Sequence, residues 1–480
     1  MGQKEFGVDA IEDLLDFGLT ASFEALPEPV IERTRLAILD TLAAMAAGVR
    51  GEGMAGLTEL YAGWGGTPQA TAISAGKKLP MGHAALLNGV AARAWDLDDV
   101  HEQNTCHINA NIVPAVLAVA EAKGGVSGRD LIVAVTVGAE MVCRLSSAPR
   151  ISFSETGSSM SYQCGFYGAA LAAARLLGLS KDRTRHALGI AHARVAGNQQ
   201  GYLAGAMTVR LMQGVAAEGG VLSALMAAHG LTGSSEILEG RFGYYHVYHR
   251  GRYDRSALVD GLGRDRWLML EPSIKPPYPC CKYTHGPIEA TVEAVRSLDV
   301  APEDIESIKV RVTNREVHDL VCLSRERKWN PQSLTDAQFS LPFTVAYAAA
   351  NRKVGLETFQ PSGLSDERAR ALLPRVETIL DLEGQGEGRG VFPMPGVVTV
   401  KDRSGRMIER RVEFVKGHPK NPMDFDDVAE KFHACASLGM PGWNGADLLI
   451  DAVRTIETIE DPGSLLRLCQ PGQNTVRAVA

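Results

Sequence analysis

Two stretches of the sequence gather residue types that can move protons or hold negative charge. The first, 92-ARAWDLDDVHEQNTCHINANIVPAV-116, contains Asp96, Asp99, His101 and His107. Asp96 and Asp99 would share one face if the preceding helix continued that far. The histidines are six residues apart, so they lack the spacing of a helical H-E-x-x-H zinc pair. Such a grouping is typical of an acid–base or binding site, and it is also typical of helix caps and surface polar residues.

The second stretch, 274-IKPPYPCCKYTHGPIEA-290, combines four prolines with two lysines, two cysteines and a histidine. Prolines fix φ and remove backbone donors, so we expect Lys275 and Lys282 to lie on a stiff, extended segment. A rigidly held cation stabilises developing negative charge better than a mobile one. His285 follows at the start of the next predicted helix. The stretch is therefore a candidate catalytic loop, beside two alternatives, a metal knuckle and a redox pair.

The cysteines argue against both alternatives. Cys280 and Cys281 are adjacent, so in an extended chain their side chains point apart, away from a single metal ion. The chain has eight cysteines and no C-x-x-C pair. We therefore expect reduced thiols and neither a zinc ribbon nor a thioredoxin-type centre. An aconitase-type iron–sulfur cluster would need three clustered cysteines, so no metal and no cofactor is predicted.

The composition narrows the class of protein. The 480 residues carry a net charge of −7 without a basic block, which argues against nucleic acid as a partner. No apolar run approaches the roughly 18 residues that span a bilayer, and the N-terminal MGQKEFGVDAIEDLLDF is neither a secretory signal nor a transit peptide. We expect a cytoplasmic protein. The stretch 384-GQGEGRG-390 lacks the context of a phosphate-binding motif and is predicted to be a surface loop.

The elements that must position these residues change character near residue 270. From about 8 to 265, apolar residues recur at three- and four-residue spacing with many Ala and Gly, which predicts closely packed helices. Beyond it, 305–317 alternates like a strand, 335–353 reads as a helix, and 397–415 reads as two strands joined by a short turn. From 424 to 469 the pattern is helical again. We predict a helical domain interrupted by a smaller α+β insertion.

The sequence resembles the MmgE/PrpD family, which includes 2-methylcitrate dehydratases, cis-aconitate decarboxylases and iminodisuccinate epimerases. The matching segments follow the family's order over nearly the whole chain: 39-LDTLAAMAAG-48, 84-AALLNGVAARAWDLDD-99, 114-PAVLAVAEA-122, 176-LLGLS-180, 278-YPCCKYTHGPIEA-290, 330-NPQSLTDAQFSLPF-343 and 417-GHPKNP-422. The resemblance implies a mainly α fold: an all-helical domain of residues 1–268 with 419–480, and an inserted α+β lid domain of residues 269–418. It also implies an active-site cleft between the domains and a homodimer.

The resemblance carries over to individual residues. Asp96 matches the active-site aspartate of the family's D-x-D-D run, and His107 matches the histidine that follows it. Lys275 and His285 match the lysine and histidine of the lid loop. His101 matches a histidine of the fungal-type decarboxylases. The second stretch is thereby identified with the family's catalytic loop.

Two departures from the decarboxylase pattern concern the substrate. Ser159, in 157-GSSMSYQCGFYG-168, stands where decarboxylases carry a histidine. In 208-TVRLMQG-214, Val209 and Met212 replace the lysine and histidine of a K-R-L-H-x-G segment, while Arg210 remains as a nearby cation. Both departures affect groups that would handle a substrate carboxylate or a proton. They leave open whether Ser159 and Arg210 take over the missing roles.

The chemistry expected of such a site is the formation of a carbanion beside a carboxylate, which requires cations and donors to stabilise the additional charge. We assign that role to Lys275, with Arg210 and Lys282 as supplementary cations. His107 would move the α-proton and His285 would protonate the leaving group or the opposite face.

Asp96 would orient a histidine, and His101 and Ser159 would contact the substrate, a small carboxylic acid. A cofactor-independent lyase (dehydratase or decarboxylase) on a di- or tricarboxylate is the main hypothesis. An epimerase of the iminodisuccinate type and a non-catalytic binding homologue are the alternatives. The sequence does not specify the substrate.

Overall fold

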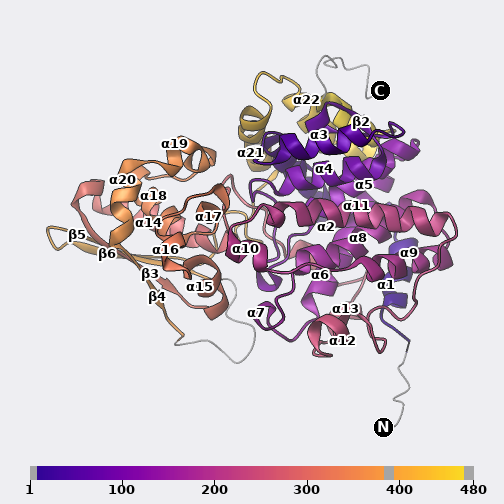
Figure 1. The fold of residues 1–480 in the computed structure, drawn as a ribbon, viewed down its shortest axis with the longest axis horizontal. Helices are drawn as coiled ribbons and strands as arrows, with labels where there is room; N and C mark the ends of the chain where they lie inside the picture. Colours follow the sequence, from indigo (N-terminus) through magenta and orange to yellow (C-terminus); the bar gives the residue numbers. More distant parts are fainter. Residues whose placement is uncertain (1–7, 383–393, 470–480) are drawn as a thin grey trace, which may run out of the picture. The chain divides into compact units, whose positions relative to one another are not determined.

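The computed structural model describes residues 8–382 and 394–469, which form two compact units (Figure 1). The first unit takes in the chain up to Gln199, Thr208–Ile274 and the chain from Asp424, and the second takes in Gln200–Met207 and Lys275–Met423. The stretch 384–390, expected to be a surface loop, lies outside the described residues. The predicted boundaries at 268 and 419, and the role of the insertion as a lid, stay predictions.

The first unit is mainly helical, as the apolar spacing predicted. Its longer helices include α1 (Ile11–Thr20), α2 (Glu28–Gly48), α3 (Met54–Trp64), α4 (Met81–Arg93), α5 (Asn109–Lys123), α6 (Gly128–Ser147), α8 (Met160–Leu177), α9 (Lys181–Arg194), α11 (Thr208–Ala228), α21 (Phe425–Gly439) and α22 (Ala446–Arg454). Shorter helices are α7 (Phe153–Thr156), α12 (Tyr244–His249) and α13 (Ser256–Val259). A two-stranded antiparallel sheet, β1 (Ala70–Ala72) and β2 (Lys77–Leu79), corrects the all-helical expectation. Its chain reversal uses Gly76 at φ +61°, a conformation that glycine adopts without strain.

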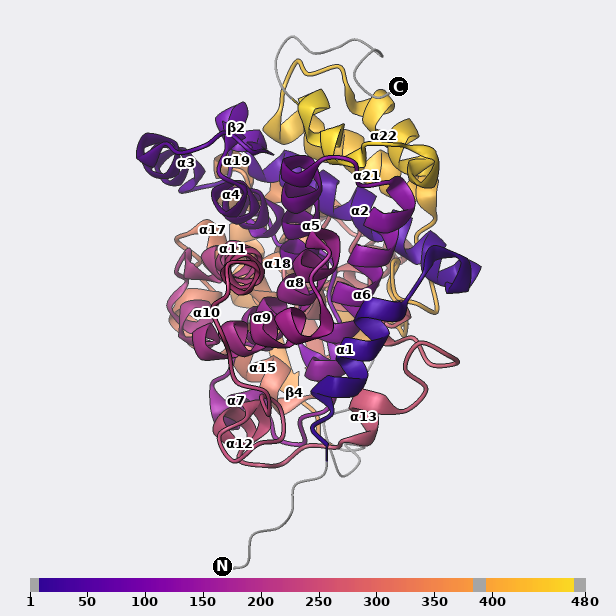
Figure 2. The same cartoon turned by 90° about the vertical axis from the view of Figure 1, so that its right-hand side faces the viewer.

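Small residues bring the helix backbones of this unit together. A Cβ on Gly214 of α11 would lie 2.3 Å from the carbonyl oxygen of Leu86 in α4, and one on Gly48 of α2 would lie 1.9 Å from the carbonyl oxygen of Ala91. No side chain fits at either crossing, so the predicted close packing through glycine is confirmed. Figure 2 shows α11 almost along its axis, with α4, α8 and α9 around it.

Helix α11 is apolar enough, over 18 residues, to cross a membrane by length and composition alone, with a mean hydropathy of 1.3. In the structure, 56% of that window is buried. A core helix of a soluble protein passes the same test, so the helix is weak evidence for a membrane span. Its packing against α4 and α8 gives it the surroundings of a core helix.

The second unit is built on a four-stranded sheet with the order β4-β3-β5-β6. Strand β3 (Ile305–Val312) pairs in parallel with β4 (Val376–Leu380) and antiparallel with β5 (Gly396–Asp402), which pairs antiparallel with β6 (Met407–Val412). Ile308, Val310 and Val312 are fully buried, so the predicted strand is confirmed. The helices of the unit are α10 (Gln200–Ala204), α14 (His285–Leu298), α15 (Arg315–Cys322), α16 (Arg325–Lys328), α17 (Leu334–Gln338), α18 (Leu341–Asn351), α19 (Pro361–Leu364) and α20 (Glu367–Leu372).

Two predicted helices are broken by their own sequence. The helix expected over 335–353 is divided into α17 and α18, because Ser340 caps a new helix by accepting from the backbone N–H of Phe343 and Pro342 stands in its first turn. The helical run expected over 446–469 ends at Arg454 and continues as 3-10 turns, the second of which begins at Pro462.

Candidate functional site

An acid–base cluster of the first unit forms where α4 ends. The helix stops at Arg93, and Asp96 then adopts a left-handed backbone conformation with φ +54°. The helix therefore does not continue to Asp99, and the expectation that Asp96 and Asp99 share a helix face is wrong. The turn instead directs Asp96 and Asp98 toward one arginine and one histidine.

His107 lies between these two carboxylates. Its Nδ1 lies 3.0 Å from Oδ2 of Asp98, and its Nε2 lies 3.8 Å from Oδ1 of Asp96. Arg93 donates to Oδ1 of Asp96 and lies 3.3 Å from Oδ1 of Asp98. All four residues are buried. His107 and Asp96 were predicted from the sequence, whereas Asp98 and Arg93 were not, although both belong to the stretch 92–116.

Further contacts fix the backbone around His107. The backbone N–H of His107 donates to Oγ of Ser161 in α8 at 2.9 Å. Asp99 accepts from the backbone N–H of Asn109 at 3.0 Å and from its side-chain amide at 2.7 Å, at the first residue of α5. Asp99 thus secures the helix that follows the loop. Ser161 gave no signal in the sequence, because only the fold brings α8 to this loop.

The carboxylates of Asp96 and Asp98 and the imidazole of His107 also satisfy a distance test for a metal site. Their candidate ligand atoms lie within 4.8 Å of one another. However, the guanidinium of Arg93 already contacts both carboxylates, and a second cation there would be repelled by it. We therefore interpret the group as an acid–base cluster.

His101 belongs to a seam that joins the loop to the chain ahead of Lys275. Val100 and Ser273 form an antiparallel bridge through two backbone hydrogen bonds, of 3.0 and 2.8 Å. Nε2 of His101 lies 3.2 Å from Oε2 of Glu271. Burial opposes ionisation of Glu271, yet the hydrogen bond and charge of His101 leave the pKa of that carboxyl below its usual value. His101 is therefore paired within the protein.

Arg210 and Ser159, the residues linked to the two departures from the decarboxylase pattern, lie in the first unit. Arg210 donates to the backbone carbonyl of Glu52 at 3.1 Å and lies 3.4 Å from its carboxylate. Burial lowers the pKa of Arg210, the charge of Glu52 opposes this, and smaller influences come from Arg93 and Asp96. Arg210 is thus an electrostatic neighbour of the acid–base cluster. Ser159 is buried and is the residue at the N-cap of α8, two positions before Ser161.

The proline loop of the second unit bends twice. The backbone N–H of Tyr278 donates to the carbonyl of Pro276, and that of Cys280 donates to the carbonyl of Tyr278, at 2.6 and 2.8 Å. Each bond spans one proline, Pro277 or Pro279, whose fixed φ suits the centre of a γ-turn. The expectation of an extended segment is therefore corrected to two consecutive tight turns.

The turns present one carbonyl oxygen to both predicted catalytic residues of the loop. The carbonyl of Cys280 accepts from Nζ of Lys275 at 3.4 Å and lies 3.1 Å from Nε2 of His285. Because a carbonyl only accepts, Nε2 of His285 carries a proton. The loop thus brings Lys275 and His285 together within the second unit.

Close packing fixes the helix that begins at His285. A Cβ on Gly396 of β5 would lie 2.0 Å from the carbonyl carbon of Gly286, so the first turn of α14 rests directly on the strand. The backbone N–H of Cys281 donates to the carbonyl of Gln338 at 2.9 Å. The loop and the helix start are thus held from two sides within the unit.

The remaining polar groups of the loop are occupied locally. Burial raises the pKa of Glu289 in α14, and the charge of Lys282, in the turn just before that helix, opposes the shift. Oγ1 of Thr284 lies 3.2 Å from Sγ of Cys280. All eight cysteines lie within the described residues, where they are buried and form no disulfide.

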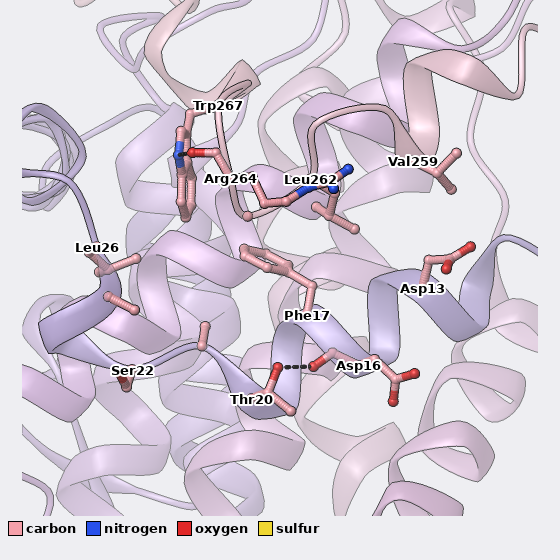
Figure 3. Close-up of a pocket in the computed structure, with 13 residues that line it drawn as sticks. Asp13, Asp16, Phe17, Thr20, Ser22, Leu26, Val259, Leu262, Arg264 and Trp267 are labelled. Atoms are coloured by element: carbon pink, nitrogen blue, oxygen red, sulfur yellow. Dashed lines mark hydrogen bonds between the residues drawn. The ribbon is translucent and has the colours of Figure 1, made fainter.

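A hollow of about 400 Å³ on the first unit contains none of the predicted site residues (Figure 3). It lies beside α1, where Phe17 packs edge-on against Trp267 with ring centroids 5.7 Å apart. Asp13, Asp16 and Arg264 also line it. The acid–base cluster of the first unit and the proline loop of the second therefore remain the two candidate sites.

Comparison with known proteins gives matches along most of the chain. The model of the MmgE/PrpD N-terminal domain matches residues 12–256, and that of the MmgE/PrpD C-terminal domain matches residues 278–448. A cis-aconitate decarboxylase of Aspergillus terreus (strain NIH 2624 / FGSC A1156) is 28% identical over 474 residues, covering 92% of each chain. The cis-aconitate decarboxylase of Homo sapiens is 27% identical over 470 residues, covering 92% of this chain and 91% of its own. A cis-aconitate decarboxylase-like protein of Aspergillus oryzae is 27% identical over 413 residues, with 80% and 81% covered.

Proposed function

Because this chain belongs to the MmgE/PrpD family and is an enzyme, we propose that it is a cofactor-independent lyase for a small di- or tricarboxylate of the cis-aconitate type. The observation that carries the proposal is the position of His107, 3.0 Å from Asp98 and 3.8 Å from Asp96. A buried imidazole held between two carboxylates has the fixed orientation that proton transfer requires. The similarity to cis-aconitate decarboxylases supports the substrate class.

In the proposed chemistry, one residue stabilises negative charge and two residues transfer protons. Lys275 stabilises the negative charge that develops when a carbanion or enolate forms beside a substrate carboxylate. His107 transfers the proton at the reacting carbon. His285 donates a proton from Nε2, the nitrogen that points at the Cys280 carbonyl in the structure. Asp98 and Asp96 share the orienting role that the sequence analysis gave to Asp96 alone.

Chain connectivity supports the participation of Lys275 with the cluster. Ser273 is bonded to Val100, seven residues before His107. Lys275 follows Ser273 by two residues, so its Cα cannot lie more than about 7 Å from that of Ser273. Val100 itself directly follows the run that contains Asp96 and Asp98.

The residues predicted from the sequence to bind substrate fall into two groups, those that we still propose as substrate contacts and those that act on carboxylates of the protein. Arg210 stays our proposal for a second carboxylate contact, since it is an electrostatic neighbour of Asp96. We still propose Ser159 as a substrate contact, because it precedes the helix that holds His107 through Ser161. His101 lies against Glu271, and the charge of Lys282 acts on Glu289, so we propose that both residues tune these carboxylates and that any contact with substrate is secondary.

A dicarboxylate epimerase is the second candidate. It is favoured by a specific observation: Val209 and Met212 stand where decarboxylases carry a lysine and a histidine, and Val209 is buried. Two-sided proton transfer needs two imidazoles and no leaving group, and His107 and His285 would supply them.

Mass spectrometry of a panel of citrate-, aconitate- and aspartate-like acids in ²H₂O tests the proposal. A decarboxylase releases carbon dioxide and a dehydratase releases water, whereas an epimerase incorporates deuterium without either loss. We expect loss of carbon dioxide or water from a tricarboxylate, and His107→Ala as the matched control should lose the activity by about 10²–10⁴-fold. Deuterium exchange alone would support the epimerase, and binding without any reaction would contradict both.

We further propose that the enzyme is a homodimer that uses a partly exposed face of α11, which borders α4 at Glu218 and Leu222. Leu211, Val215, Glu218, Leu222 and Leu225 follow one another at alternating spacings of four and three residues and stay partly exposed. This is the spacing of a seam between two packed helices. The nearby helix α3 buries only Met54 and leaves Trp64 62% exposed.

Charge on this face is compatible with a second copy. Glu218 is the one charged residue of the stripe; burial raises its pKa, and the charge of Arg194 in α9 opposes that shift. Light scattering after size exclusion should give twice the chain mass for the wild type. Leu222→Glu should give monomer, and Met407→Glu on exposed β6 should leave the dimer intact. A monomeric wild type would contradict this proposal.

A further inference from the structure

A buried lysine of α21 contacts the backbone of the acid–base loop. Nζ of Lys431 in α21 donates to Oδ1 of Asp40 in α2 at 2.5 Å and to the backbone carbonyl of Leu97 at 2.7 Å. The side chains of Lys431 and Asp40 are 0% and 1% exposed. Leu97 is the residue between Asp96 and Asp98, so the lysine holds the Leu97–Asp98 peptide group, one of the two that separate the carboxylates around His107.

A gain in folding stability does not explain why the chain buries the Lys431–Asp40 ion pair. Desolvating two charges costs about as much as their attraction returns, and well-packed apolar residues of similar volume are often neutral or stabilising replacements. Oδ2 of Asp40 is buried and accepts no hydrogen bond. An apolar pair could fill the same space, but it could not donate to the carbonyl of Leu97.

The carbonyl of Leu97 has a reason to need a fixed partner. Asp96, one residue earlier, has φ +54°, a conformation that costs a non-glycine residue free energy and persists only where neighbours enforce it. Trp95 donates from Nε1 to the carbonyl of Ala47 in α2 at 3.1 Å, so the loop is tied to α2 at a second point. Together these contacts hold the strained turn that aims Asp96 at Arg93.

We infer that Lys431 is a positioning residue of the active site, which acts through the Leu97 carbonyl to hold Asp96 and Asp98 in the geometry that His107 requires. Asp40 serves as the counter-ion that keeps the ammonium in place. Arg33 of α2 extends the arrangement, because its charge acts on Asp40 and its guanidinium donates to the carbonyl of Pro272 at 2.6 Å. The inference deepens the proposed function and rests on it for the catalytic consequence.

The test separates the counter-ion from the carbonyl contact. Lys431→Met should lower both the melting temperature and the turnover of cis-aconitate. The double variant Asp40→Leu with Lys431→Met removes both charges, so its melting temperature should return to within a few degrees of the wild type. Its kcat should remain about 10–100-fold low, because the Leu97 carbonyl still lacks its donor. A double variant with wild-type stability and wild-type kcat would overturn the inference.

Asp40→Asn provides the conservative contrast, also if the double variant fails to fold. Its amide oxygen can still accept from Lys431, so the lysine keeps its hold on Leu97 and kcat should stay within about threefold of the wild type. A loss as large as that of Lys431→Met would contradict a role exerted through Leu97.

Hydrogen exchange tests, without any substrate, whether Lys431 holds the acid–base loop in place. Amide exchange measured by mass spectrometry should accelerate in the peptide 94–108 of the Lys431→Met variants and of the double variant, and should not change in Asp40→Asn. Exchange in α8 serves as the internal control. Unchanged exchange in the 94–108 peptide of the double variant would overturn the inference, and absence of cis-aconitate turnover by the wild type would count against the proposed function alone.

Discussion

The acid–base loop of the first unit and the proline loop of the second hold their reactive groups in different ways. The first depends on residues distant in sequence: Ser161 holds the backbone of His107, and Lys431 holds that of Leu97. The second is bent mainly by its own sequence, with two γ-turns that direct one carbonyl at Lys275 and His285, and Gln338 holds only the backbone of Cys281 from a distance in the chain. A carboxylate cluster needs counter-charges that only the fold can deliver, whereas a stiff loop can be specified by a few prolines.

The difference has an energetic consequence. Two buried carboxylates are stable only with a cation beside them, so the first loop couples catalysis to the stability of the unit. The proline loop also buries charge, since Lys275 and Lys282 are buried, but its bends are fixed largely through restrictions on the backbone. Substitutions in the first loop should therefore affect stability and rate together, and substitutions of the prolines in the second should affect mainly rate.

The largest expected effect is at Arg93. Arg93→Met removes the cation that contacts both Asp96 and Asp98, so we expect a loss of about 3–5 kcal/mol in the free energy of unfolding and a loss of activity. Denaturant unfolding followed by circular dichroism measures the first. Arg129→Met is the control, since its partner Glu24 is exposed and the expected loss is under about 1 kcal/mol. If Arg93→Met and Arg129→Met had equal unfolding free energies, the acid–base loop would not couple catalysis to stability, and the proposed difference between the loops would be contradicted.

A smaller effect is expected from pH at Asp40. Burial raises the pKa of Asp40 to about 6 from 3.8, against the opposing charge of Lys431, with further contributions from Asp99 and Arg33. The folded state therefore binds this proton more tightly, so the stability it contributes is present below pH 3.8 and is lost as pH rises through 6.

We expect the unfolding free energy of the wild type to fall by up to about 2–3 kcal/mol from this group between pH 4 and pH 7. Asp40→Asn cannot ionise and should lack this component. Denaturant titrations of both proteins at three pH values measure the difference. A gap between them that stays constant with pH would show that Asp40 does not titrate in this range.

The smallest effect is expected in the proline loop. Pro277→Ala relaxes the centre of the first γ-turn, so kcat should fall by about 3–30-fold while the unfolding free energy changes by less than about 1 kcal/mol. Pro361→Ala, at the first residue of α19 in the same unit, is the matched control and should leave kcat unchanged. If kcat fell in proportion to the loss of unfolding free energy in both proline variants, the proline loop would couple rate to stability as the acid–base loop does.

The sequence predicted the parts of the molecule that depend on local pattern. The mainly helical fold, the alternating strand at Ile308 to Val312 and the start of a helix at His285 follow from periodicity and from proline, and the structure agrees. The apolar spacing over 335–353 predicted one helix, but the helix is interrupted because Ser340 and Pro342 start a new one.

The candidate site was predictable only in part, for the same reason. His107, Asp96, Lys275 and His285 stand in motifs that can be read along the chain. Asp98 belongs to the same motif, but nothing in a single sequence shows which carboxylate of a D-x-D-D run faces the histidine. Arg93 reads as the end of a helix.

Partners from distant elements gave no signal at all. Ser161 and Lys431 lie 54 and 334 positions from the residues that they hold, His107 and Leu97. Such contacts arise from helix packing, which the spacing of apolar residues predicts only in general terms. Sequence patterns therefore identify reactive groups more readily than the groups that hold them in place.

The central claim is that the acid–base cluster and the proline loop act on one substrate. A double-mutant cycle of His107→Ala and Lys275→Ala, with kcat for cis-aconitate as the measurement, tests it most directly. We predict that each single variant loses at least about 10²-fold and that the double variant is within about threefold of the slower single one, because groups that act as a unit are strongly non-additive. Losses that multiply in the double variant, or wild-type turnover by either single variant, would contradict the claim.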